Sequence, residues 1–88
     1  MDTRLDARRL SRLKWRCRRG LLENDLLIER FFRRHETALT APQADGLEAL
    51  MELPDNDLLD VLLARRGLPA ELDRPDVQAV LALLRERS

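Results

Sequence analysis

The sequence predicts an all-α protein, a compact bundle of five short helices, on three observations. Apolar residues recur at spacings of three, four and seven, and no segment alternates between apolar and polar residues with period two. Capping residues, glycines and prolines divide the chain into five segments of helix length. The 88 residues are 44% apolar, which is enough for one modest hydrophobic core. We therefore expect a single domain that spans residues 1–88.

The first helix is expected from Leu5 to Arg18. Its core stripe, at positions i, i+3 and i+7, consists of Leu10, Leu13 and Cys17. Trp15 falls on the opposite side of the helix, where its neighbours are Arg8, Arg12 and Arg19. Gly20 should end the helix at the C′ position, because glycine readily adopts the left-handed backbone conformation found there.

The second helix should begin within Leu21–Asn24 and continue to about Thr37. Its main apolar face is formed by Ile28, Phe31, Phe32 and His35. Leu22 and Leu26 lie outside this face, so we expect the helix to be covered on two sides.

The third helix begins at a predicted capping box, in which Thr40 accepts from the backbone N–H of Gln43 and the Gln43 side chain reaches back. Its inward residues should be Leu47, Leu50 and Met51.

Two more helices complete the bundle. The fourth should start at the acidic turn Pro54–Asp57 and end before Gly67 and Pro69. Its apolar residues are Leu58, Leu59, Leu62 and Leu63. The segment Asp73–Asp76 should cap the fifth helix, and the apolar stripe of that helix is Val77, Val80, Leu81 and Leu84.

Charge is balanced overall but divided along the chain. There are 16 basic and 16 acidic residues, yet residues 1–36 hold 11 Lys and Arg against 6 Asp and Glu. The remainder holds 5 against 10, so the two halves carry opposite net charge. No apolar run approaches the ~20 residues that span a bilayer, and no apolar segment typical of a signal peptide opens the chain. We expect a cytoplasmic protein without membrane insertion.

The residues offer little chemistry for catalysis. The three glycines, at positions 20, 46 and 67, form no phosphate-binding loop. The single cysteine, Cys17, cannot form an internal disulfide, and with one histidine, His35, the chain lacks ligands for a zinc site. A nucleophile–base pair of Cys17 and His35 is disfavoured, because both lie on apolar faces of separate helices. We expect no catalytic residue, no bound metal and no stably bound cofactor.

The junction between the first two helices is the unusual feature. Arg19 and Glu23 flank the glycine turn, and Trp15 lies one turn upstream. Exposed tryptophan and arginine are frequent in the energetically important centres of protein interfaces. The alternative is structural: Arg19 and Glu23 pair with each other or with neighbouring charges, and Trp15 folds onto the fourth or fifth helix.

This junction resembles the succinate dehydrogenase FAD assembly factors, whose signature is R-G-x-x-E. The signature stands here as Arg19-Gly20-Leu21-Leu22-Glu23, within a longer family-like string over residues 12–32. A second similar block covers residues 50–58, and the likeness extends over about residues 5–66. The chain departs from the family at Val61, where a large aromatic residue is frequent, and in the absence of tyrosine.

The resemblance implies a five-helix protein that binds the flavoprotein subunit of succinate dehydrogenase, and in bacteria that of fumarate reductase. It would promote covalent attachment of FAD to a histidine of that subunit, which itself binds the FAD and forms the bond. The factor would then be no enzyme. We expect it to be a monomer. The partner-binding residues that we carry over or add from the same string are Arg19, Gly20, Glu23, Trp15, Arg12 and Arg16.

An arginine-rich nucleic-acid-binding or antitoxin-like regulator is the rival prediction. Its phosphate contacts would be Arg8, Arg9, Arg12, Lys14, Arg16, Arg18 and Arg19. Two observations disfavour this prediction. The cations are distributed around the first helix and do not form one stripe, and the second half of the chain is acidic.

Overall fold

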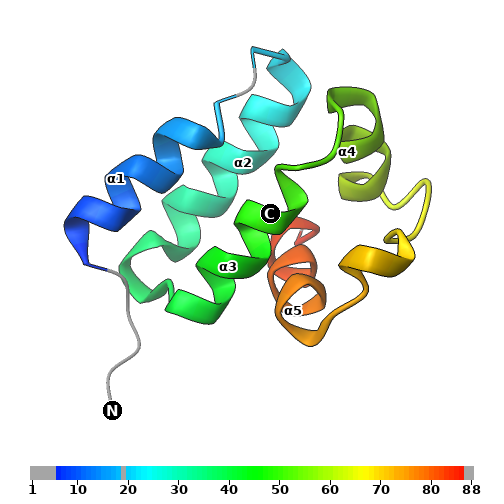
Figure 1. Cartoon of the computed structure of the whole chain (residues 1–88). Coiled ribbons are helices and arrows are strands. Elements are labelled where there is room, and N and C mark those ends of the chain that lie inside the picture. The colour runs from blue at the N-terminus through cyan, green and yellow to red at the C-terminus, as the bar shows by residue number, and fades with distance from the viewer. Residues whose placement is uncertain (1–5, 19, 87–88) are drawn as a thin grey trace.

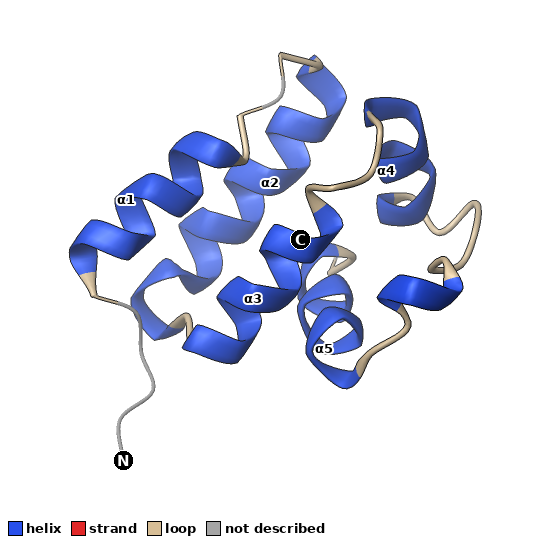
Figure 2. Ribbon diagram, viewed as in Figure 1, coloured by secondary structure: helices blue, strands red, loops and turns tan. Residues whose placement is uncertain are grey.

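Five α-helices account for most of residues 6–18 and 20–86, which are the residues that the structure, a computed structural model, describes. Their bounds are α1 Ala7–Arg16, α2 Leu22–His35, α3 Ala41–Leu50, α4 Asp55–Leu62 and α5 Pro75–Leu84. Two 3-10 turns, η1 Glu36–Ala38 and η2 Ala70–Leu72, join α2 to α3 and α4 to α5. Figure 2 shows helices and loops and no strand over these ranges, which confirms the predicted all-α class.

The five helices pack around one core. α1 and α2 are an antiparallel pair, and α3 follows α2 and packs most extensively on α5 (Figure 1). α4 lies on the far side of α2 from α1 (Figure 1). No helix in the described ranges has both the length and the apolar character needed to cross a membrane.

Every helix contributes to one hydrophobic cluster. Its fully buried members include Leu13, Phe31, Leu47, Leu58, Val77 and Leu84. The predicted stripes of the first, third and fifth helices are thus confirmed, apart from Leu10, which is only partly buried.

The close packing of α3 on α5 depends on a glycine. A Cβ atom built on Gly46 would lie 2.5 Å from the carbonyl oxygen of Asp76, at the start of α5. Only a residue without a side chain lets the two backbones approach this closely.

The first helix is shorter than predicted. The Asp6 side chain caps it by accepting a hydrogen bond of 2.7 Å from the backbone N–H of Arg9, and Leu5 lies outside the described residues. The helix ends at Arg16 with Cys17 as C-cap, so Gly20 does not occupy C′. Gly20 nevertheless has the left-handed conformation that was expected, with φ of 81°. Gly20 therefore lies in the turn that leads into α2 and not at the end of α1.

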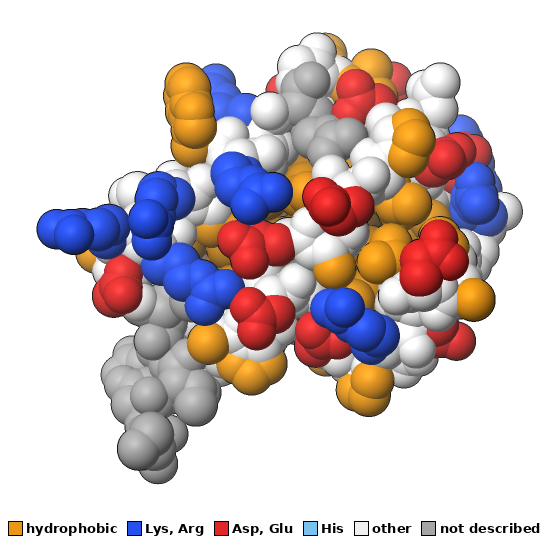
Figure 3. All heavy atoms as spheres, viewed as in Figure 1, with side chains coloured by type: hydrophobic (Ala, Val, Ile, Leu, Met, Phe, Trp, Pro, Cys, Tyr) orange, Lys and Arg blue, Asp and Glu red, His pale blue; other side chains and the backbone are white. Residues whose placement is uncertain are grey.

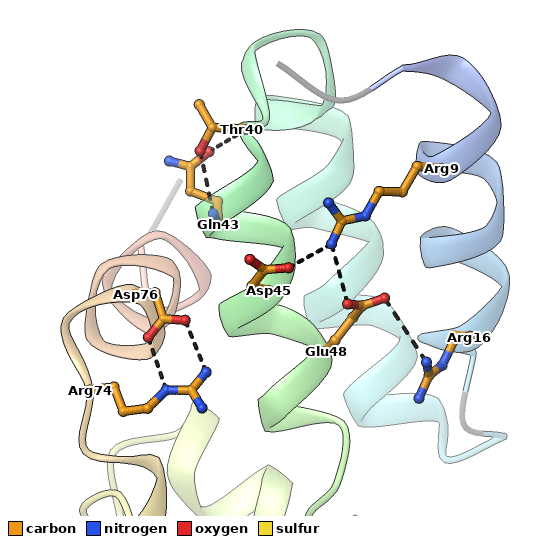
Figure 4. Close-up of polar contacts among 8 residues, drawn as sticks. All are labelled: Arg9, Arg16, Thr40, Gln43, Asp45, Glu48, Arg74 and Asp76. Carbon is orange, nitrogen blue, oxygen red and sulfur yellow. Dashed lines mark hydrogen bonds and ion pairs between the residues drawn. The ribbon is translucent and has the colours of Figure 1, made fainter. Parts of the chain in front are cut away.

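The capping box before α3 is confirmed in both directions. The Gln43 backbone N–H donates to Thr40 Oγ1 at 3.3 Å, and the Thr40 N–H donates to Gln43 Oε1 at 2.9 Å (Figure 4). Two of the unpaired N–H groups at this helix start are therefore satisfied locally.

The fourth helix corrects two predictions. Val61 is fully buried, whereas Leu63 is 40% exposed, because the helix ends at Leu62 and its core face is set by the spacing from Leu58. The left-handed residue that ends it is Ala64, with φ of 60°, and not Gly67.

The bonds at this helix end form a Schellman motif. The Ala64 N–H donates to Val61 O at 3.1 Å, and the Arg65 N–H donates to Asp60 O at 2.8 Å. An alanine therefore occupies the position that glycine usually takes.

The predicted cap of the fifth helix is also corrected. Its N-cap residue is Arg74, without a side-chain cap bond, and Pro75 occupies the first helical position. Asp73 instead accepts a hydrogen bond from the Gln78 side chain. Asp76 makes two hydrogen bonds with Arg74, of 3.1 and 2.9 Å (Figure 4).

Candidate functional site

The turn between α1 and α2 forms an exposed corner, here called the α1–α2 corner and defined by Gly20 and Glu23. The Gly20 backbone N–H donates to Asp25 Oδ2 at 3.2 Å, which holds the turn against the first turn of α2. A Cβ atom at Gly20 would meet nothing within 4 Å, so its positive φ, and not lack of space, favours glycine here. Arg19 lies outside the described residues.

Glu23 presents an exposed carboxylate at the N-terminal end of α2. The partial positive charge of a helix N-terminus stabilises an anion there. Among the residues that the structure describes, this carboxylate has no hydrogen-bond or ion-pair partner. The alternative that Glu23 pairs with Arg19 involves a residue outside the described ones. The exposed carboxylate can accept hydrogen bonds from a docking protein.

Trp15 is 73% exposed, which excludes the alternative that it folds onto the fourth or fifth helix. The Arg18 guanidinium lies 5.8 Å from the centre of its ring, within the range of a cation–π contact. An exposed site makes such a contact worth about 0.5–1 kcal/mol. Trp15 thus remains available to a partner at the same end of the helix pair as Gly20.

The two other arginines predicted to bind a partner separate in space. Arg12 is exposed on the outer side of α1, as predicted. Arg16 faces α3, where its guanidinium lies 4.0 Å from Glu48 (Figure 4). Arg16 thus has a contact within the fold, and its role in binding a partner stays a prediction.

An ion-pair network joins α1 to α3. Arg9 contacts Asp45 at 2.7 Å and Glu48 at 3.4 Å (Figure 4). The hydrogen bond with Asp45 raises the pKa of Arg9 above its usual value, although partial burial opposes the shift. Figure 3 shows basic side chains gathered over α1 with acidic side chains beside them over α3. Part of the basic character of the first helix is thus neutralised within the fold.

A groove of about 660 Å³ runs between α1 and α2, and sequence reasoning missed it. We call it the α1–α2 groove. Its buried lining residues are Cys17, Ile28 and Phe32. Its charged lining residues are the cations Lys14, Arg18 and Arg33 and the anions Asp25, Glu29 and Glu36. No local signal in the sequence marks it, because its walls come from helices that meet only in the folded chain.

Leu22 and Leu26 are exposed, by 69% and 56%, and we name this pair the leucine ridge. The prediction that α2 is covered on two sides, with another helix over Leu22 and Leu26, is wrong. The helices α4 and α5 pack on the opposite side of α2, which carries the buried residues Asn24, Ile28 and Phe31. Their position outside the main apolar stripe is visible in the sequence, but it does not tell whether another helix covers them.

Asn24 is fully buried directly after Glu23 and was not singled out from the sequence. Its Nδ2 donates to the carbonyl oxygen of Asp55 at 3.1 Å, which ties the start of α2 to the start of α4. Within the described ranges, its Oδ1 has no hydrogen-bond partner. This bond links the turn of α2 that carries Glu23 to the start of α4.

Cys17 and His35 do not form a nucleophile–base pair. Cys17 directly follows the last residue of α1, and His35 is the last residue of α2. Because the two helices are antiparallel, these residues lie at opposite ends of the pair (Figure 1). His35 Nε2 instead lies 2.8 Å from Glu86 Oε1, at hydrogen-bond distance.

Comparison with known proteins identifies similar chains. A family model described as "flavinator of succinate dehydrogenase" matches residues 11–88. The chain is 56% identical to the FAD assembly factor SdhE of Ralstonia nicotianae over 80 residues, which are 91% of this chain and 84% of that protein. It is 44% identical to the FAD assembly factor SdhE of Vibrio cholerae over 73 residues, 77% of this chain and 85% of that protein. No solved structure matches the chain.

Proposed function

Because the chain belongs to the family of succinate dehydrogenase flavinators, we propose that it binds the flavoprotein subunit of succinate dehydrogenase at the α1–α2 corner and promotes covalent attachment of FAD to it. The observation that carries the proposal is the exposed corner itself. Gly20 there holds a left-handed turn, and Glu23 presents a carboxylate without a partner in the described residues. Arg19, between Arg18 and Gly20, completes the proposed contact.

The chemistry of recognition follows from these groups. Gly20 lets the partner's surface approach the backbone closely, since no side chain stands in the way. The Glu23 carboxylate, and the Arg19 guanidinium, make charge-assisted hydrogen bonds, which are roughly twice as strong as neutral ones. Trp15 adds a large exposed ring at the same end of the helix pair.

Binding alone accounts for the activity that we propose. A factor that binds one conformation of the flavoprotein more tightly than others shifts the population toward it, by no more than its difference in affinity. The favoured conformation is one in which the FAD and the acceptor histidine, both held by the partner, are aligned. The factor itself supplies no nucleophile and binds no cofactor stably, and it acts as a monomer in the cytoplasm. The flavoprotein of fumarate reductase is a second partner of the same kind.

The rival function, nucleic-acid binding, has less support. Three cations of α1 make ion pairs with carboxylates: Arg9 with Asp45 and Glu48, Arg16 with Glu48, and Lys14 with Glu36. Phosphate binding requires a row of cations free to replace counterions. Pairing within the protein lowers the positive potential that such a row needs.

Covalent flavin formation is the test. The chain is co-expressed with the succinate dehydrogenase flavoprotein of its host in cells that lack their own factor, and protein-bound flavin fluorescence is measured on a denaturing gel. The wild-type chain should produce a fluorescent flavoprotein band. Glu23→Ala and Gly20→Arg should weaken it.

Matched variants control for charge and size. Glu71→Ala removes an exposed acid at η2, and Gly67→Arg adds a side chain where nothing lies within 4 Å of the new Cβ. Both should leave the band unchanged. A wild-type chain that fails to increase covalent flavin would refute the function, and full activity of Gly20→Arg would refute its placement at the corner.

A further inference from the structure

The leucine ridge borders the α1–α2 groove. Leu22 precedes the groove-lining Asp25 by three residues and Glu29 by seven, which places the three on one edge of α2. Leu26 relates in the same way, by three and seven, to the groove-lining Glu29 and Arg33. Trp15 lines the groove from α1. One continuous surface therefore has apolar side chains on both of its edges.

We propose that the α1–α2 groove and the leucine ridge bind an apolar, uncharged segment of the flavoprotein subunit, next to the charged contacts of the α1–α2 corner. The inference rests on the proposed function, because it assigns the same partner to a second surface. It separates two roles: the corner recognises polar groups of the flavoprotein, and the exposed side chains of Trp15 and the leucine ridge supply apolar binding energy.

The charges around the groove favour an uncharged occupant. Lys14 pairs with Glu36 at 2.8 Å, and Arg33 pairs with Glu29 at 2.9 Å. The remaining lining cation, Arg18, stacks over the Trp15 ring, and the lining acid Asp25 accepts from the Gly20 N–H. With three cations and three anions in its lining, the groove attracts neither a polyanion nor a polycation.

The exposed apolar area is too small for a stable dimer on its own. A tryptophan side chain buries up to about 250 Å² and a leucine roughly 100 Å², so the partly exposed Trp15, Leu22 and Leu26 offer on the order of 300 Å². A stable interface buries about 800 Å² on each partner. The additional area must come from an adjoining surface, and the adjoining surface is the corner.

Sequence adjacency points to the same partner. Leu22 lies between Gly20 and Glu23 in the chain and is more than two-thirds exposed, at 69%. A protein that touches the Gly20 backbone and the Glu23 carboxylate also covers the Leu22 side chain. Leu26 follows one helical turn later on the same edge.

The test measures affinity for the purified flavoprotein subunit, at low and at high salt, for the wild type and for Leu22→Ser, Leu26→Ser and the double variant. Each single substitution should weaken binding by about tenfold, and the double by more, at both salt concentrations. The Glu23→Ala variant should instead lose more affinity at low salt than at high salt.

Leu63→Ser is the matched control. Leu63 is 40% exposed at the end of α4, away from the groove, so this variant should bind like the wild type. Because all three leucines are exposed, thermal unfolding of the four variants should match that of the wild type.

The outcomes separate this inference from the proposed function. If the double variant binds the flavoprotein with an affinity within twofold of the wild type, the inference alone is overturned, and the corner remains the docking surface. A concentration-dependent dimer that is lost in the double variant also overturns it, because the ridge then binds a second copy. Failure of the wild type to bind the flavoprotein overturns the proposed function, and the inference with it.

Discussion

Replacing Gly46 by alanine tests the contact between α3 and α5. The new methyl carbon would lie 2.5 Å from Asp76 O, 2.8 Å from Asp76 C and 3.1 Å from Val77 N. Ordinary contact requires about 3.4 Å or more, so the two helices must separate by close to an ångström. All three atoms belong to the backbone of α5, which cannot rotate away as a side chain would.

Two effects oppose each other in this variant. Alanine is favoured over glycine in a helix interior by about 1 kcal/mol. Overpacking a core costs about 1–3 kcal/mol, and the upper end applies here because a gap of 0.5–1 Å forfeits a quarter to a half of each neighbouring contact. The helices flanking the clash carry the buried residues Leu47, Leu50, Val77, Val80 and Leu81. The net result should be a loss of about 2 kcal/mol.

Thermal and urea unfolding, followed by circular dichroism, measure this loss. For a domain of this size, about 2 kcal/mol lowers the Tm by on the order of 10 °C. Gly67→Ala is the control, because its Cβ meets nothing within 4 Å, and its stability should change by less than about 0.5 kcal/mol. A Gly46→Ala variant as stable as the wild type would refute the reasoning, since α3 and α5 could then not be in backbone contact.

Three further predictions concern single sites. Ala64→Gly should raise the free energy of unfolding, measured in urea, by about 0.5–1 kcal/mol, because φ of 60° strains alanine more than glycine. Asn24→Ala should lower it by about 1–2 kcal/mol, since the Asp55 carbonyl loses its bond from Nδ2. Hydrogen bonds from Arg74 hold the pKa of Asp76 below its usual 3.8, so the associated stability is present above that pH and is lost as the pH falls through the lower folded value. Asp76→Asn should therefore show a smaller decrease of the urea midpoint between pH 5 and pH 3 than the wild type.

Each of these has a result that contradicts it. A destabilised Ala64→Gly would mean that the entropy of glycine in the unfolded chain outweighs the relief of strain. An Asn24→Ala variant of unchanged stability would mean that the bond between α2 and α4 contributes nothing. Equal pH dependence in Asp76→Asn and the wild type would show that the pair with Arg74 does not persist in solution.

Local patterns were enough to predict the helices and part of the site. The spacing of Leu13 and Cys17 identified the buried side of α1, because helical periodicity is a property of neighbouring residues. The capping box at Thr40 was readable for the same reason. The position of Trp15 opposite the core stripe and the left-handed turn at Gly20 were also predicted from their places on and after one helix. The sequence left open whether Trp15 folds onto the fourth or fifth helix, and the structure shows that it is exposed.

Features that depend on how helices meet were not readable. The contact of Arg16 with Glu48, for example, depends on the approach of α3, which no pattern near Arg16 in the sequence indicates. The leucine ridge is exposed, and the groove beside it is open, because α4 and α5 cover the opposite face of α2.

The sequence by itself thus determined the helical class, the core faces of the first, third and fifth helices and the residues at the α1–α2 turn, since each of these depends on residues within a few positions of one another. The tertiary structure alone decided which apolar side chains stay exposed, which charges neutralise one another and that Gly46 must lack a side chain. The physical reason is that burial, ion pairing and close backbone approach are set by atoms from helices distant in the chain, whose placement no local pattern encodes.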